Sequence, residues 1–300
     1  MSLVSSILLA PRRTIGLLHA LLALALFGSL LGLVWGRGAA LFPAGPERIS
    51  LGNSRSALFV GQNREAPVVI FLHAATGSAQ EAFRSSGFAE AAQRGGLNIA
   101  FGDSRDGVWR FTGLNGAVDR SDDAYVLDLR SALFRRGYGF GGFYLVGQSN
   151  GGMIALQVAC AHPGDFEGVA IVASGMPAMV GENCRWLPAR AVVVAGEADP
   201  VIPIGGGVGT VPGIGSFWSL DRLGAFLRQQ RGCVRFEIGP DTGVATTVMP
   251  IRAVDCRRSA AVHLFRVVDG GHDGLLRAVP PETVLRAVRG DGSALVLSGR

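Results

Sequence analysis

Three residues of this 300-residue chain have the side chains and the order along the sequence that nucleophilic catalysis requires. Ser149 stands in the pentapeptide GQSNG, Asp199 in the loop sequence GEADP, and His272 in the turn sequence DGGHDG. A serine hydroxyl is a weak nucleophile unless a base takes its proton, and an imidazole oriented by a carboxylate is such a base. The set therefore predicts acyl transfer, in which Ser149 attacks, His272 moves the proton and Asp199 holds the imidazole. No metal ion or cofactor is expected.

The residues on either side of Ser149 predict the turn that would present its hydroxyl. The strand-like run 143–146 (FYLV) enters the pentapeptide, and the apolar stretch 153–161 (MIALQVACA) follows it. A serine on such a strand-to-helix turn has a strained backbone, so we expect small residues beside it, here Gly147 and Gly151. The pentapeptide alone is weak evidence in a chain with 44 glycines, because a glycine-rich turn with a solvated serine is the alternative. The flanking strand and helix favour a nucleophile.

The other two members of the set also stand just after predicted strands. The run 191–195 (AVVVA) leads into the loop that carries Asp199, and the run 262–268 leads into the turn that carries His272. The chain order serine, aspartate, histidine is that of α/β-hydrolases, in which each residue lies at a strand-to-loop junction.

Other acids and histidines compete with this assignment. Glu197 is the closest alternative acid, because it lies on the same loop as Asp199. Asp269 and Asp273 flank the histidine in sequence, so their carboxylates would reach its ring poorly. We expect structural roles for two further histidines, His162 before a proline and His263 inside a strand.

The rest of the chain supplies the elements that would hold these residues in place. Short apolar runs without alternation are typical of buried parallel strands, whereas longer amphipathic runs indicate helices. The additional strands are expected at 66–74, 97–101 and 168–173, and helices at 80–94, 121–136 and 216–231. Alternating strands and helices predict a mostly parallel sheet with helices on both faces, which is the α/β-hydrolase fold.

The loop that follows strand 66–74 has the composition of an oxyanion-binding loop. In α/β-hydrolases this loop gives one backbone N–H to the oxyanion, and the residue after the nucleophile gives the other. Here the two donors would be the amides of Ala75 and Asn150. We expect His73, at the start of the loop, to hold it structurally.

Two residues near the expected nucleophile are candidates for a substrate pocket. Trp109 lies in the polar stretch 102–116, which is either a pocket wall or an ordinary connection anchored by its aromatic residues. Gln148 directly precedes Ser149.

Composition excludes several classes of protein. Hydrophobic residues make up 48% of the chain and charged residues 17%, which suits a folded core and argues against disorder. The formal net charge is +5, but the 28 basic residues are all arginines scattered along the chain, so no nucleic-acid partner is expected. The four cysteines lack any C-x-x-C pair, which disfavours a zinc site and fits two disulfides in any of three connectivities.

The N-terminal region predicts export. Residues 15–35 carry no charge and are long enough to cross a bilayer as a helix, with Arg12 and Arg13 before them and Arg37 after. This charge bias places the N-terminus in the cytoplasm and the rest of the chain outside it. Residues 1–40 are then a signal anchor, or a signal peptide cleaved near 38–40 (GAA), while a buried core helix is the alternative. Residues 41–300 form the single catalytic domain, secreted, periplasmic or held on the membrane by an uncleaved helix.

Longer motifs give a family resemblance. The sequences YLVGQSNGGMIALQVACAHPGDFEGVAIVASGMP, GEADPVIP and VDGGH resemble the polyhydroxybutyrate depolymerase and feruloyl-esterase-like family of secreted α/β-hydrolases, over residues 67–274. The resemblance implies a triad of Ser149, Asp199 and His272. It also implies a disulfide between Cys233 and Cys256 near the last strands. Cys160 and Cys184 are then the pair that remains.

The chain departs from that family around the expected pocket. His73-Ala74 stands where the family has His-Gly, and Asp273-Gly274-Leu275 stands where it has an aromatic residue and a proline. The stretch 101–103 also lacks the family's tyrosine-proline pair.

The resemblance and the three residues together predict an exported serine carboxylesterase. Its substrate would be a small-molecule or oligomeric ester, either phenolic of the feruloyl type or a short hydroxyalkanoate. A peptidase or an acyltransferase on the same fold is the first alternative, because fold does not determine function. A membrane-tethered binding protein with an inactive site is the second.

Overall fold

The computed structural model describes residues 45–52, 55–111, 118–211, 214–240, 246–257 and 260–291. The chain divides into two units, Met1–Gly45 and Pro46–Arg300, and the description that follows concerns the second. The predicted export segment, with its apolar run 15–35 and its small residues 38–40, lies outside the described residues. In the ranges described, no helix is both long and apolar enough to span a membrane.

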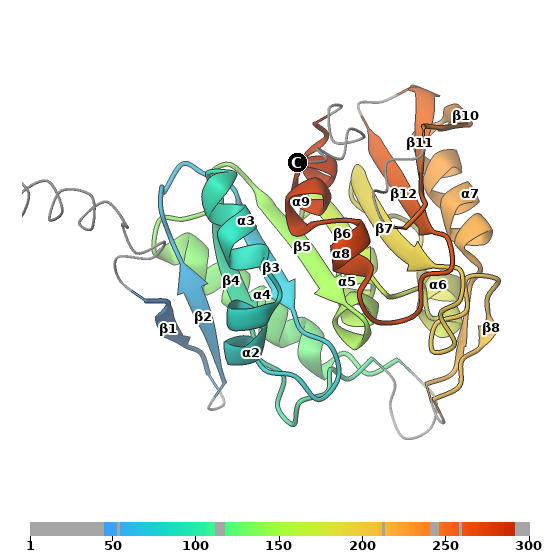
Figure 1. Ribbon diagram of the computed structural model, residues 1–300. Coiled ribbons are helices and arrows are strands. Elements are labelled where there is room, and N and C mark those ends of the chain that lie inside the picture. The colour runs from blue at the N-terminus through green and yellow to red at the C-terminus, as the bar shows by residue number, and fades with distance from the viewer. Residues whose placement is uncertain are drawn as a thin grey trace, which may run out of the picture. The chain divides into compact units, whose positions relative to one another are not determined.

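One mixed sheet runs through the second unit (Figure 1). Its strands are β1 (Glu47–Ser50), β2 (Ser56–Val60), β3 (Val68–Leu72), β4 (Asn98–Gly102), β5 (Phe143–Gln148), β6 (Gly168–Val172), β7 (Arg190–Gly196), β10 (Cys233–Ile238), β11 (Val248–Cys256) and β12 (Ala261–Val267). Their spatial order is β1-β2-β4-β3-β5-β6-β7-β12-β11-β10. The pairs from β4 through β12 are parallel, and those at both ends of the sheet are antiparallel. Every residue of β3, β4 and β6 is buried, as expected of strands covered on both faces.

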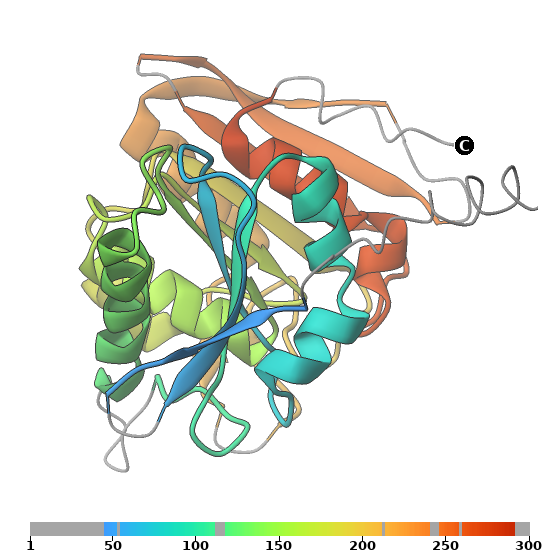
Figure 2. The ribbon, with the colours of Figure 1, turned by 90° about the vertical axis from the view of Figure 1, so that its left-hand side faces the viewer.

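Helices cover both faces of this sheet, as the sequence predicts. They are α2 (Ala79–Ser85), α3 (Phe88–Arg94), α4 (Ser121–Arg135), α5 (Asn150–Ala161), α6 (Ala178–Asn183), α7 (Leu220–Arg231), α8 (Leu275–Ala278) and α9 (Pro281–Arg289). Helices α3 and α9 pack together on one face, and α5 packs between α4 and α6 on the other. In Figure 2 the green helices α4 and α5 lie on one side of the sheet, and the cyan and red helices on the opposite side. The predicted α/β architecture is confirmed.

Two predicted helices have different boundaries in the structure. The single helix expected at 80–94 is two helices, because Gly87 between them has a φ of 75°, which a helix does not allow. The helix expected at 216–231 begins only at Leu220, where the Ser219 hydroxyl accepts the N–H of Arg222 as an N-cap. The residues before it form β9 (Ser216–Phe217), which pairs with β8 (Gly207–Val208).

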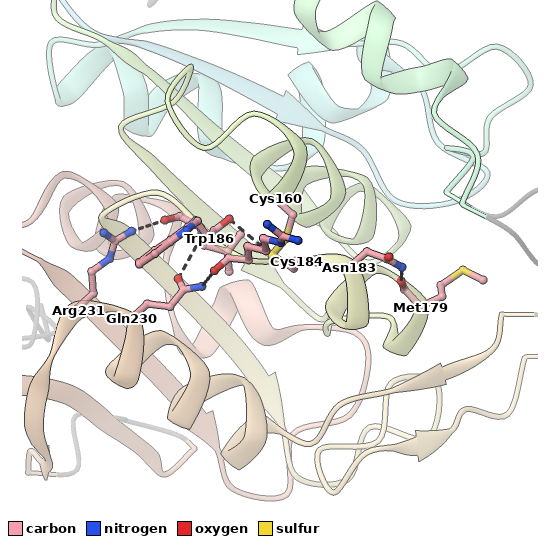
Figure 3. The surroundings of a disulfide bond; sticks show 9 residues. Cys160, Met179, Asn183, Cys184, Trp186, Gln230 and Arg231 are labelled. Carbon is pink, nitrogen blue, oxygen red and sulfur yellow. Dashed lines mark hydrogen bonds between the residues drawn. A yellow bond between two sulfur atoms is a disulfide. The ribbon is translucent and has the colours of Figure 1, made fainter.

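The structure contains the disulfide that the family resemblance implies and the pair of cysteines that it leaves. Cys233 and Cys256 are directly opposite one another in the β10–β11 ladder and are bridged. Cys160, near the end of α5, is bridged to Cys184, just after α6. Figure 3 shows this second bridge beside α7, whose Gln230 donates a hydrogen bond to the carbonyl of Arg185. The bridge therefore ties the helix behind Ser149 to the segment on which α7 packs.

Candidate active site

Ser149 occupies a strained turn between β5 and α5. Its φ of 51° and ψ of −120° lie outside the regions that a non-glycine residue ordinarily adopts. The two glycines of the pentapeptide make this turn possible. A Cβ on Gly147 would collide with the backbone of Gly151, and a Cβ on Gly151 would collide with the carbonyl of Leu72 at the end of β3. The expectation that both neighbours must be small is confirmed.

The structure brings Ser149, His272 and Asp199 into one hydrogen-bonded chain. The Oγ of Ser149 lies 2.9 Å from Nε2 of His272, and Nδ1 of that ring lies 2.8 Å from Oδ2 of Asp199. The Asp199 side chain is buried, and its Oδ1 accepts the backbone N–H groups of Val201 and Ile202 at 2.8 and 2.9 Å. These bonds fix the carboxylate, so that an Nδ1–H donor is favoured and the Nε2 lone pair faces the hydroxyl.

The competing acids and histidines lie elsewhere. Glu197 forms an ion pair with Arg266 on β12, so its carboxylate is engaged away from the histidine. Within the described ranges, His272 donates no hydrogen bond to Asp269 or Asp273. His263 is buried within β12, and this burial lowers its pKa to about 4.

The two residues expected to supply the oxyanion donors line one cleft, just beyond the ends of two adjacent strands. β3 and β5 pair in parallel with Leu72 opposite Gly147, and Ala75 and Asn150 each lie three residues further along. Both residues line the cleft at Ser149. Among the described residues, neither backbone N–H has a hydrogen-bond acceptor, so both remain available to a ligand. Asn150 is also the first residue of α5, where the helix dipole favours negative charge.

A cleft of about 780 Å³ opens beside Ser149. Its walls are largely apolar, and the side chains that make them so are Val108, Trp109, Phe111, Val201, Val211 and Ile214. Gln148 lines it next to the serine, as does His272. The charged residues of the lining are Asp273 and the exposed pair Asp106 and Arg110, whose side chains are 2.8 Å apart. Cleft volumes in this range suit small organic ligands.

His73 and Trp109 hold the loops on either side of the cleft. The Nδ1 atom of His73 donates to the carbonyl of Ala74 at 2.7 Å, and its Nε2 accepts the N–H of Ser104 at 3.2 Å. Burial lowers the pKa of this imidazole, which agrees with a neutral ring that donates on one side and accepts on the other. The Trp109 side chain is almost fully buried and donates its indole N–H to the carbonyl of His73 at 2.9 Å.

Arg55 and Asp122 form a buried ion pair that contacts the segment containing Arg110, and the sequence does not predict it. The Arg55 guanidinium lies 2.5 Å from Asp122 and 3.6 Å from the centre of the Tyr125 ring, and it donates to the carbonyl of Asp103. The other oxygen of Asp122 accepts the N–H of Arg110 on the cleft wall at 2.8 Å. Sixty-seven residues separate the two charges, and no local motif marks either of them.

Within the described ranges, no three histidine, cysteine, aspartate or glutamate side chains converge as a metal site would require.

Comparisons with known proteins agree with this architecture. No family model matches the sequence. A protein from Nocardia uniformis subsp. tsuyamanensis, named "Putative esterase NocK", is 32% identical over 145 residues. The match spans 47% of this chain and 42% of that protein, so the chain covers less than half of the relative's length.

Solved structures show the same fold at low sequence identity. Acetyl xylan esterase from Aspergillus awamori aligns with a TM-score of 0.55 and 11% identity, over 76% of this chain and 94% of its own. An α/β-hydrolase-like protein of unknown function from Agrobacterium tumefaciens aligns with a TM-score of 0.53 and 15% identity, over 82% of this chain and 97% of its own. The chain has the α/β-hydrolase fold.

Proposed function

We propose that this α/β-hydrolase is a serine carboxylesterase in which Ser149 is the nucleophile, His272 the base and Asp199 the acid that orients it. One observation carries the proposal: the Oγ, imidazole and carboxylate form a continuous hydrogen-bonded chain that ends in an open cleft. A solvated serine in an ordinary turn would need neither the strained backbone nor the buried carboxylate.

The reaction proceeds by two acyl transfers. Ser149 Oγ attacks the ester carbonyl carbon while Nε2 of His272 takes its proton, and the carbonyl oxygen becomes an oxyanion. The backbone N–H groups of Ala75 and Asn150 stabilise this oxyanion, since both lack other acceptors among the described residues. The imidazolium then protonates the leaving alcohol, an acyl-enzyme remains on Ser149, and a water activated by the same histidine releases the acid.

The cleft favours a substrate with a compact apolar group. Trp109 and Phe111 on one segment, with Val201 and Ile214 on another, would contact an aromatic or short aliphatic group attached to the ester. These contacts suit a phenolic ester of the feruloyl type or a short hydroxyalkanoate oligomer. The names of the Nocardia and Aspergillus proteins support ester hydrolysis in general and do not specify this substrate.

The proposed location is outside the cytoplasm. Both disulfides require an oxidising compartment to form and persist, and all four cysteines are engaged in them. Export would follow from the charge-free N-terminal run 15–35, either as a cleaved signal or as a membrane anchor.

Hydrolysis of short-chain p-nitrophenyl esters and methyl ferulate, compared between the wild type and Ser149→Ala, tests the proposal. We expect turnover by the wild type, loss of at least a thousandfold in kcat in the variant, and unchanged thermal stability. Turnover that survives the substitution would contradict the proposed nucleophile. No turnover by either protein would favour a binding protein with an inactive site.

A further inference from the structure

Trp109 contacts both segments that carry the proposed oxyanion donors. Its backbone N–H donates to Oδ1 of Asn150 at 2.7 Å, and Nδ2 of the same amide donates back to the Trp109 carbonyl at 3.0 Å. Its indole N–H donates to the carbonyl of His73, two residues before Ala75, at 2.9 Å. The three hydrogen bonds are buried, so each is protected from exchange with water.

These bonds are unusual for a residue that merely lines a cleft. The two donors belong to loops after β3 and β5, and the sheet aligns them only as far as the strand ends at Leu72 and Gln148. Beyond that point the backbone of Gly151 packs against the carbonyls of Leu72 and His73. Trp109 adds a hydrogen-bonded connection, because one residue bonds the side chain of Asn150 and the backbone of the loop that precedes Ala75.

We infer that Trp109 and the side-chain amide of Asn150 are positioning residues that fix the separation of the two oxyanion donors, an inference that rests on the proposed function. Oxyanion stabilisation depends on donors that are already in place when charge develops, and errors of about 1 Å in position are costly. Asn150 thus has two separate roles. Its backbone N–H contacts the oxyanion, and its side chain holds the tryptophan that aligns the second donor.

Two substitutions break the connection while keeping both backbone donors. Asn150→Ala removes both bonds to the Trp109 backbone, and Trp109→Phe keeps a buried aromatic ring but removes the indole N–H that His73 accepts. We expect each to lower kcat by roughly 10- to 100-fold, a part of the 10²- to 10³-fold that loss of a whole donor costs. KM should stay within about threefold, because the ester binds before the oxyanion forms. The double variant should lose little more than the worse single variant, since both act on one connection.

Two matched controls separate positioning from folding. Asn98→Ala removes another buried side-chain amide, which accepts the backbone N–H of Gln62 and donates to the carbonyl of Ala66, at the start of β4. Trp218→Phe makes the same aromatic exchange at a buried tryptophan whose indole N–H has no acceptor among the described residues. We expect both controls to keep kcat within about twofold, although Asn98→Ala should lower the unfolding temperature.

The decisive readout is the affinity for a trifluoromethyl ketone, which forms a tetrahedral oxyanion adduct with a serine nucleophile. In Asn150→Ala and Trp109→Phe the inhibition constant should rise in proportion to the fall in kcat, while KM does not follow. If kcat matches the controls, or falls without any loss of inhibitor affinity, the inference is wrong. Should Asn150→Ala fail to fold, Trp109→Phe decides alone. If Ser149→Ala leaves the activity unchanged, the proposed function and this inference are both wrong. If the activity depends on Ser149 but is unchanged in Asn150→Ala and Trp109→Phe, only the inference is wrong.

Discussion

At the scale of single residues, the burial of Asp199 distinguishes it from the other acids near His272. Its carboxylate is almost inaccessible to solvent and has three hydrogen-bond donors, counting the imidazole. The sequence predicts both the loop and its acid, although Glu197 two residues away has the same chemistry. What decides between them is the direction of each side chain, which places Glu197 against Arg266. That choice depends on a contact 69 residues away and has no local signature.

Asp199→Asn should lower kcat by about 10³- to 10⁴-fold with little change in KM. The amide can no longer impose an Nδ1–H donor on His272, so the ring loses the tautomer that accepts the serine proton. Steady-state kinetics on a p-nitrophenyl ester measures this effect. Glu197→Gln is the matched control. We expect it to keep wild-type turnover, because the Glu197 side chain pairs with Arg266 and, in the described ranges, accepts no hydrogen bond from the His272 ring. An equal loss in both variants would contradict the assignment of the acid.

At the scale of elements, the sequence predicts the buried parallel strands but does not predict the antiparallel pair β10–β11 at the edge of the sheet. Strands such as β3 and β6 are unbroken apolar runs, because helices cover both of their faces. β10 and β11 form the last two strands at one edge, where exposed and buried residues mix without a clear period. Similarly, the bonds of Trp109 join loops whose proximity follows only from the completed sheet. The sequence thus identifies the acyl-transfer residues but not the contacts that align them.

β12 carries a buried histidine that makes stability depend on pH. The pKa of His263 falls from 6.5 to about 4, chiefly through burial and secondarily through the Arg252 cation on β11. The unfolded chain therefore binds a proton below about pH 6.5, while the folded chain does not until about pH 4. The free energy of unfolding should decline across this window as pH falls, by up to about 3 kcal/mol from this residue.

His263→Leu should remove that part of the decline. Urea denaturation at pH 7 and at pH 4.5 measures it, with the wild type and the variant compared at both values. The variant should lose less stability on acidification, although some decline remains because burial lowers the pKa of His73 as well. Equal losses of unfolding free energy in the two proteins would show that His263 has an ordinary pKa in the folded state.

At the scale of the whole molecule, two disulfides join segments that meet near the C-terminal end of α7. One closes the edge hairpin and the other ties the end of α5 to the segment after α6, with sequence separations of 23 and 24 residues. Four cysteines alone allow three pairings, so composition could predict the number of bridges but not their connectivity. The family resemblance implies the Cys233–Cys256 pair and leaves Cys160 with Cys184, and the structure confirms both pairs.

The two disulfides close loops of nearly equal length, so each should stabilise the folded protein by nearly the same free energy. Removing either bridge, as Cys160→Ala with Cys184→Ala or as Cys233→Ala with Cys256→Ala, should lower the free energy of unfolding by about 3 kcal/mol on chain entropy. Urea denaturation of the two double variants measures both losses. A thiol assay on the unreduced, denatured wild type should detect no free cysteine. Four free thiols would contradict the bridges and remove the support they give to export.

The most direct test of the whole account is covalent labelling by diethyl p-nitrophenyl phosphate, which reacts with an activated serine and mimics the first acyl transfer. The account predicts release of one equivalent of p-nitrophenolate per chain and a diethylphosphoryl group on the peptide that contains Ser149. It also predicts no label in Ser149→Ala and much slower labelling in His272→Ala. A label on another residue, or a wild type that hydrolyses esters without acquiring one, would contradict Ser149 as the nucleophile.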